Sequence, residues 1–233
     1  MSRYTTAYSE FVGRCDEVLI LVGRAKQLER SKLAFSHGSE IDALCRGAIV
    51  LLSSHVEAYV KELGECALDA IFNRGVCRSK LSPRIFFYAS KGWVDRLKDA
   101  TEPEKVSAEV FEFLCGDAEL WVRKGPLPNP IDSEEFSKGF ANPKFDKVKK
   151  FLGRFGYDGL RHHINVSLGR DAGLAVSNLD QIVDTRNAIA HGEASATKTP
   201  GEVKLLVASA RQLCRTVDDG FSNWCKSEIC SIR

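Results

Sequence analysis

The sequence predicts an all-α protein folded as a helical bundle, and two observations lead to that prediction. Apolar residues recur at helical spacing through most of the chain, and no segment shows the apolar–polar alternation typical of a half-buried strand. The composition, with 44% hydrophobic and 27% charged residues, is that of a globular domain. A chain of 233 residues has ample material for one core, so we expect a single domain over residues 1–233.

The longest helices are expected near the two ends of the chain. The first covers about residues 5–35 and breaks at "HGS" (37–39). The second covers 40–72, and a last helix covers about 200–230. The second helix has an apolar stripe wide enough for the centre of a bundle. That stripe consists of Leu44, Ala48, Leu52, Val56, Tyr59 and Leu63, widened by Ile49, Val50 and Val60.

A less regular insert is expected over about residues 73–142. Two shorter helices are predicted in it, over 84–99 and 104–122. Residues 124–143 hold four of the seven prolines and therefore form mostly loop. A loop of this length inside a compact domain suggests that a partner or a function orders it.

Two further helices are predicted in the C-terminal half, of which the later one carries most of the chemistry. Ser177 and Asp180 have the spacing of a capping box, so this helix is expected to begin at Ser177. It should run to His191 and stop at Gly192, since glycine readily ends a helix in the left-handed conformation.

The earlier of these helices, over 144–156, is amphipathic and basic on one side. Lys147, Lys149, Lys150 and Arg154 are candidates for holding an RNA backbone, because a few phosphate contacts supply much of the affinity for nucleic acid. The alternative is a solvated helix face, which is the more common case.

Charge and cysteine usage exclude several classes of protein. A net charge of +2 is too small for a protein that binds nucleic acid over its whole surface, so any contact with nucleic acid is expected to be local. The eight cysteines contain no CxxC pair, and we interpret them as reduced thiols of a cytoplasmic protein without metal or cofactor. The N-terminus "MSRYTTAYSEF" lacks a signal-peptide pattern, and the longest apolar run, "AIVLL", is too short to span a bilayer. We therefore expect no membrane contact.

Residues 184–193, "DTRNAIAHGE", carry the most suggestive chemistry. Arg186 falls within the apolar stripe of its helix. A guanidinium cannot lose its proton and is costly to bury unpaired, so it must face an anion or water at an interface or in a cleft. Asp184, Asn187 and His191 follow at spacings of three and four, which places their side chains on an adjacent face.

These groups suit cleavage of a phosphodiester bond without a metal. One imidazole can take the proton from a ribose 2′-hydroxyl, and another can protonate the leaving 5′ oxygen. Arg186 can stabilise charge on the phosphate, and Asn187 can hold the imidazole or a phosphate oxygen. The need for the 2′-hydroxyl makes RNA the expected substrate. Arg186 and His191 lie about 140° apart on an ideal helix, and a second protomer at this edge could bring two arginines and two histidines together.

The spacing of arginine and histidine is not specific by itself. An arginine followed by four to six residues and a histidine is expected roughly once in a chain of this composition. Arg30 and His37 form a second match, but they lack the apolar stripe behind them and the helix stop after them. The functional interpretation therefore depends on the whole segment, with its predicted helix N-cap, its apolar stripe and the glycine that ends the helix.

Three segments together resemble a known family. "RNAIAHG" resembles the signature of HEPN domains, in which an arginine and a polar residue precede a histidine. "LLSSHVEAYVKEL" and "FANPKFDKVKKFLGRFGYD" resemble segments of the bacterial HEPN group that includes the RiboL-PSP-associated members. The resemblance covers most of residues 40–72 and 140–192.

The resemblance implies a HEPN-like helical bundle with extra helices, acting as a metal-independent endoribonuclease. It implies a homodimer in which the two signatures face each other, with Arg186, Asn187 and His191 as catalytic residues. Glu57 matches an acidic position of the second helix, and Asp184 is a further supporting candidate. Such domains often serve as toxins or anti-phage effectors, so a cognate antitoxin or defence-system partner is also expected.

Other interpretations of the same residues stay open. Arg186 could pair with an acidic neighbour while His191 caps the helix end, and Glu57 could be a surface partner of Lys61. The chain could be a non-catalytic HEPN module that dimerises and binds RNA or a nucleotide. A metal-dependent nuclease is disfavoured, because no group of Asp, Glu and His has the spacing of metal ligands.

Overall fold

The computed structural model describes residues 4–31 and 34–233, and this part of the chain is all-α, without a strand. The predicted fold class is therefore confirmed. Short 3₁₀ turns lie at Ala34–His37, Arg78–Lys80 and Gly169–Asp171. The helices, in chain order, are α1 (Thr6–Glu29), α2 (Gly38–Asn73), α3 (Pro83–Ala89), α4 (Lys91–Asp99), α5 (Pro103–Gly116), α6 (Ser133–Ser137), α7 (Phe145–Gly153), α8 (Leu160–Leu168), α9 (Ala172–Ala190) and α10 (Pro200–Glu228).

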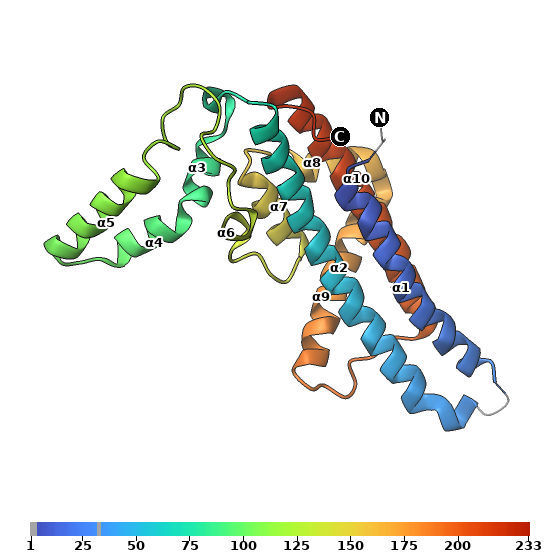
Figure 1. Ribbon diagram of the computed structural model, residues 1–233. Coiled ribbons are helices and arrows are strands. Elements are labelled where there is room, and N and C mark those ends of the chain that lie inside the picture. Colours follow the sequence, from blue (N-terminus) through green and yellow to red (C-terminus); the bar gives the residue numbers. More distant parts are fainter. Residues whose placement is uncertain (1–3, 32–33) are drawn as a thin grey trace.

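Helices α1, α2, α9 and α10 form the bundle that holds most of the core (Figure 1). Helix α1 runs antiparallel along α2, α10 packs against both, and α9 packs against α2 and α10. Helix α2 is central because it contacts each of the other three. Among the described residues it is also the one helix with the length and hydropathy of a membrane span, and 44% of that window is buried within the fold. Its position in the core accounts for its apolar composition.

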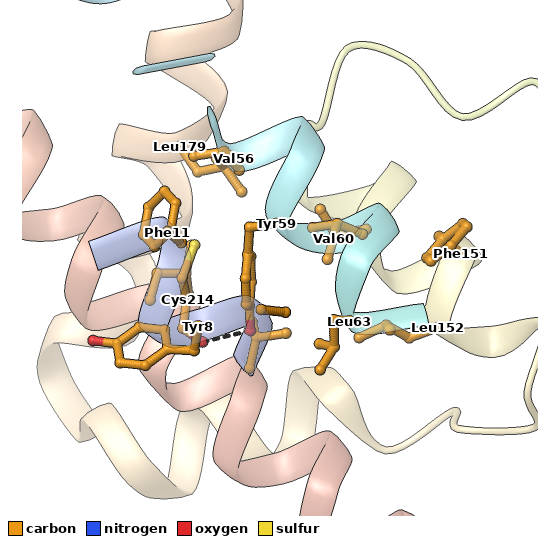
Figure 2. Close-up of a cluster of buried hydrophobic side chains, with 14 of the residues drawn as sticks. Tyr8, Phe11, Val56, Tyr59, Val60, Leu63, Phe151, Leu152, Leu179 and Cys214 are labelled. Atoms are coloured by element: carbon orange, nitrogen blue, oxygen red, sulfur yellow. Dashed lines mark hydrogen bonds between the residues drawn. The ribbon is translucent and has the colours of Figure 1, made fainter. Parts of the chain in front are cut away.

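Tyr59 of α2 lies fully buried in the core, near Phe11 of α1 and Cys214 of α10 (Figure 2). Its hydroxyl donates a hydrogen bond to the Cys214 carbonyl oxygen at 2.8 Å, so the buried polar atom is satisfied. Burial raises the pKa of Tyr59 well above its ordinary value. Phe151 of α7 enters the same core from another side and comes so close to α2 that only Gly64 leaves room for its ring.

The insert projects from the bundle as an arm that includes α4 and α5 (Figure 1). These two helices pair with each other: Trp93 stacks on Phe113 with 4.1 Å between ring centroids, and Arg96 forms an ion pair with Glu109. Neither helix has a fully buried residue. The chain returns to the core at α6, where Phe136 is completely buried.

The boundaries of the three long helices agree with expectation in part. Helices α2 and α10 lie within a few residues of their predicted limits. Helix α1 ends at Glu29 rather than near residue 35, and a separate turn over Ala34–His37 leads into α2. Residues 32 and 33 of the predicted helix lie outside the described part of the chain.

Two predicted helices of the insert are wrong in extent. The segment 84–99 is divided into α3 and α4 at Ser90, whose backbone leaves the regular helical conformation. The Ser90 hydroxyl accepts a hydrogen bond from the indole of Trp121, so a contact between distant residues favours this break. The segment 104–122 ends as a helix at Gly116, because glycine is a poor helix former. Residues 124–143 are mostly loop, as predicted, apart from α6.

The predicted start of the signature helix is also wrong. Helix α9 begins at Ala172, directly after a turn at Gly169, so Ser177 lies inside the helix and forms no N-cap. Asp180 does not complete a capping box. Its carboxylate accepts a hydrogen bond from the backbone N–H of Phe145 at 2.8 Å. The Asp180 carboxylate, which the sequence pattern assigned to a capping box, therefore makes a tertiary contact with the start of α7.

Candidate functional site

The end of helix α9 presents the predicted signature where the core meets solvent. The buried side of α9 ends at Val183. Beyond it, Arg186 and Asn187 are half-buried and His191 is exposed. The apolar stripe thus carries Arg186 to the edge of the bundle, as its charge requires.

Gly192 ends α9 as predicted. Its φ of +83° lies in the left-handed region, which glycine adopts without steric cost. The N–H of Gly192 bonds to the Ile189 carbonyl oxygen and that of Glu193 to the Ala188 carbonyl oxygen, both at 3.0 Å. This pair of bonds is a Schellman motif. It holds His191 at a defined helix end.

Two amide oxygens orient the guanidinium of Arg186. Its Nη1 donates to Oδ1 of Asn142 at 3.2 Å and to Oδ1 of Asn187 at 3.1 Å. Both acceptors are neutral, and within the described residues Arg186 forms no ion pair with a carboxylate. The alternative in which Arg186 pairs with an acidic neighbour is therefore not seen among the described residues. The positive charge is positioned but not neutralised.

Asn142 is a residue of this site that sequence reasoning missed. It lies in the loop before α7 with φ of +55°, the one non-glycine residue of the described chain in that region. Its backbone N–H donates to Oε2 of Glu57 at 3.3 Å, while Oε1 of Glu57 lies 2.8 Å from Nζ of Lys61. Glu57 is therefore both a partner of Lys61 and a link to the Arg186 cluster. The sequence signal that could have indicated a turn here is an asparagine directly before a proline, a pair typical of turns.

Two carboxylates of α9 fasten the segment that contains Asn142. Asp184 forms an ion pair with Lys144 at 2.6 Å, and this hydrogen bond raises the pKa of Lys144. One turn earlier, Asp180 accepts the N–H of Phe145. Asp184 therefore acts as a positioning residue for the loop before α7. We refer to Glu57, Asn142, Asp184, Arg186 and Asn187, together with His191 one helical turn beyond Asn187, as the Arg186 cluster.

The loop after the signature is tied to helix α2. Arg46 donates to the carbonyl oxygens of Glu193 and Ala194 at 2.9 and 3.2 Å. Thr197 donates to the Asp42 carboxylate at 3.1 Å. Sequence reasoning missed Arg46 as well, because its acceptors are backbone atoms that no side-chain pattern marks.

The family model of RiboL-PSP-HEPN matches residues 9–223 of the chain. The chain belongs to the RiboL-PSP-HEPN family. The match extends beyond the resemblance noted above and takes in most of α1 and the whole insert. Comparison with curated proteins and with solved structures finds no significant match.

His191 is an exposed member of the cluster in this HEPN domain. Its imidazole is exposed and forms no hydrogen bond or ion pair with any residue that the structure describes. Other histidines are engaged elsewhere: His37 faces Glu40 of α2, His55 faces Glu17 of α1, and His163 faces a serine of α8. One chain therefore offers one free imidazole at the Arg186 cluster.

Three of the four predicted basic residues of α7 are accessible to some degree. Lys147 and Lys150 are exposed, and Lys149 is half-buried. None of the three forms an ion pair within the described residues. They therefore stay candidates for contact with an anion.

Arg154 does not share the exposed face of α7 with these lysines. Arg154 is buried, and its guanidinium donates to the carbonyl oxygens of Phe136 and Lys138. It also stacks on the ring of Tyr88, 4.3 Å from the centroid. Burial lowers the pKa of Arg154. The helical pattern placed it with the lysines, but it fastens the end of α6 to α7.

No group of three His, Cys, Asp or Glu side chains in the described ranges lies together as a metal ion would require. All eight cysteines are unpaired thiols. Several of them fill buried helix faces: Cys15, Cys45, Cys214 and Cys225.

Proposed function

We propose that this HEPN domain is a metal-independent endoribonuclease whose active site combines the α9 ends of two copies of the chain. The observation that carries the proposal is the state of Arg186, a half-buried guanidinium that two amides orient and that forms no ion pair with a carboxylate of the described chain. A fixed, unpaired cation suits a phosphate that gains charge in the transition state. The free imidazole of His191 at the same helix end supplies proton transfer.

The proposed reaction is transesterification at one phosphodiester bond of RNA. The imidazole of His191 takes the proton of the ribose 2′-hydroxyl, and the 2′ oxygen attacks the neighbouring phosphorus. The bond from phosphorus to the 5′ oxygen breaks, and the protonated His191 of the second copy gives its proton to that oxygen. The products are a 2′,3′-cyclic phosphate and a 5′-hydroxyl end. Arg186 stabilises the negative charge on the phosphate, and Asn187 keeps the guanidinium in place.

The need for two proton-transfer groups supports a homodimer. One group must act as base while the other acts as acid, and one chain presents a single free histidine at the cluster. A two-fold symmetric contact at the α9 end would bring the same residues from both copies to one place. The dimer is thus part of the proposal for the site itself.

We further propose that the activity serves a toxin–antitoxin or anti-phage defence system in the cytoplasm. Unrestrained cleavage of RNA would harm the cell that makes the protein, so a cognate antitoxin or defence-system partner would control it. The exposed His191 supports this, since a partner that covers it would block the site. The arm supports a protein partner as well, because its Phe111 and Leu114 are exposed.

The second candidate is a non-catalytic HEPN module that uses the same helix end to bind RNA or a nucleotide. The same unneutralised Arg186 favours it, because anion binding needs the guanidinium but no proton transfer. Replacement of His191 by Gln separates the two functions. Gln retains hydrogen bonding, so binding would persist, whereas cleavage would stop.

The test compares wild type, His191→Ala and His162→Ala during induction in a bacterial host, with growth and the integrity of total RNA as readouts. His162 is a matched control, because it is also an exposed histidine but lies on α8. We expect wild type and His162→Ala to arrest growth and fragment RNA, and His191→Ala to do neither. Purified wild type should cut RNA equally well in EDTA.

Three outcomes would each contradict a part of the proposal. Cleavage by purified His191→Ala at the wild-type rate would place the chemistry elsewhere. Purified, folded and dimeric wild type that binds RNA without cutting it would favour the binding module. Loss of cleavage in EDTA would contradict the metal-independent mechanism.

A further inference from the structure

A basic groove lies between helices α3, α7 and α8, apart from the Arg186 cluster. Its volume is about 400 Å³. Its charged lining consists of Arg84, Lys149, Lys150, Arg154, Arg161 and Asp158. Three separate segments of the chain contribute cations, so the groove exists only in the folded protein.

The groove gathers more positive charge than the whole chain carries. Its lining has five cations and one carboxylate, hence a net charge of +4, whereas the chain has a net charge of +2. The remainder of the molecule is therefore negative by two charges. Such a concentration raises the local potential and favours an anion there.

Most of these cations lack an internal counter-ion. Asp158 is engaged by Arg84, whose Nη1 lies 2.7 Å from its Oδ1. Within the described residues, Lys149, Lys150 and Arg161 form no ion pair. Like charges held side by side repel one another, and a bound anion relieves that repulsion.

We propose that this groove binds the phosphodiester backbone of RNA, a few nucleotides away from the bond placed at the Arg186 cluster. The proposal rests on the function proposed above. Helix α7 connects the two places: Asp184 of the cluster pairs with Lys144 directly before α7, and Lys150 follows six residues later, about 9 Å along the helix axis. One strand of RNA is long enough to contact both.

The groove suits a phosphate backbone better than a free nucleotide. Recognition of a nucleotide base needs an aromatic face or a set of polar groups for its edge. The one aromatic residue of the lining, Tyr88, has a ring face covered by the guanidinium of Arg154. The remaining polar groups are almost all cations, which contact phosphate without reading sequence.

The test measures binding of a single-stranded 2′-O-methyl RNA, which cannot form the 2′ nucleophile, so binding is separated from cleavage. Fluorescence anisotropy at several salt concentrations compares wild type, Lys149→Gln/Lys150→Gln and Lys204→Gln/Lys226→Gln. The second pair is the matched control, since it removes the same number of charges from two exposed lysines of α10 that lie outside the groove. We expect Lys149→Gln/Lys150→Gln to bind at least about tenfold more weakly, with the slope of log affinity against log salt reduced by about 1.4. Lys204→Gln/Lys226→Gln should stay within about twofold of wild type.

The proposal is overturned if Lys149→Gln/Lys150→Gln binds like wild type, or if Lys204→Gln/Lys226→Gln weakens binding as much. It is also overturned if free ATP competes for the groove as strongly as an RNA of equal phosphate concentration, which would make the groove a nucleotide site. Unchanged thermal unfolding of both variants shows that folding is intact.

A parallel cleavage assay on unmodified RNA distinguishes this proposal from the nuclease. Binding that depends on Lys149 and Lys150, with no cleavage by wild type, supports the groove and contradicts the nuclease. Cleavage by Lys149→Gln/Lys150→Gln with an unchanged KM supports the nuclease and contradicts the groove.

Discussion

At the scale of single residues, the state of Arg186 depends on how the nearby carboxylates are occupied. Asp184 is paired with Lys144, and Glu57 is shared between Lys61 and a backbone N–H. The guanidinium is left with amide oxygens, whose dipoles orient it without cancelling its charge. A carboxylate partner would hold Arg186 equally well but would oppose the binding of a phosphate.

Replacement of Asn142 tests whether this orientation matters. In Asn142→Gly the backbone keeps its left-handed conformation, because glycine adopts it freely, and the N–H to Glu57 remains. The hydrogen bond from Arg186 to the side-chain amide oxygen of residue 142 is lost. A hydrogen bond to a charged group is worth about 1.5–3 kcal/mol, so we expect RNA cleavage roughly ten- to hundredfold slower. Stability should change by less than about 1 kcal/mol in urea unfolding.

The control for this variant is Asn129→Gly, an exposed asparagine of the same insert that lies away from Arg186. It should cut RNA at the wild-type rate. If Asn142→Gly is equally active, Asn187 alone orients the guanidinium, and the loop before α7 has no part in the reaction.

At the scale of elements, helix α7 is the piece on which both proposed contacts with RNA depend. It has nine residues and is held at three places. Its start bonds to Asp180 of α9, its Phe151 packs on α2 opposite Gly64, and Arg154 directly after it bonds to carbonyls around α6. A shift of α7 would move the groove lysines and the loop with Asn142 together.

The contact of α7 with α2 leads to a prediction for stability. A Cβ atom on Gly64 would lie 2.8 Å from two atoms of the Phe151 ring, which is closer than real contacts allow. Gly64→Ala therefore forces the ring or the helix to move, and we expect a loss of about 1–3 kcal/mol in the free energy of unfolding. Urea denaturation measures it.

Gly47→Ala is the matched control on the same helix. A Cβ there would meet only Leu21 Cδ1 at 4.0 Å, an ordinary contact. Since alanine favours a helix over glycine, this variant should be as stable as wild type or more stable by up to about 1 kcal/mol. The opposite order of the two variants would show that α7 does not pack on α2 as described.

At the scale of the whole molecule, the proposed active site belongs to a pair of chains. If acid and base come from different copies, an excess of His191→Ala chains should suppress the wild type. At a ninefold excess with free exchange of subunits, about 90% of wild-type chains pair with a variant, so cleavage per wild-type chain should fall about tenfold. The measurement is the initial rate of RNA cleavage in such mixtures.

An equal excess of His162→Ala provides the comparison, since that variant keeps the signature and should add activity. Cleavage in proportion to the wild-type chain alone, whatever the excess of His191→Ala, would show that each copy acts independently and would contradict the composite site.

The sequence by itself determined the features that depend on local chemistry. The all-α class follows from the spacing of apolar residues, and the central place of α2 follows from the width of its stripe. The stop of α9 at Gly192 follows from the one residue type that adopts a positive φ freely. The signature residues were recognisable in the same way, because they occupy a single helix end.

Only the tertiary structure decided which residues meet. Asn142 and Arg186 are 44 residues apart, and Glu57 and Asn142 are 85 apart, so no local pattern marks their contacts. The same holds for Asp180, whose carboxylate accepts a hydrogen bond from a distant backbone N–H and does not form the predicted cap. Arg154 was misassigned because periodicity gives the angle of a side chain around its helix but not what lies opposite. The groove is assembled from three helices, and its charge appears only when their packing brings the cations to one surface.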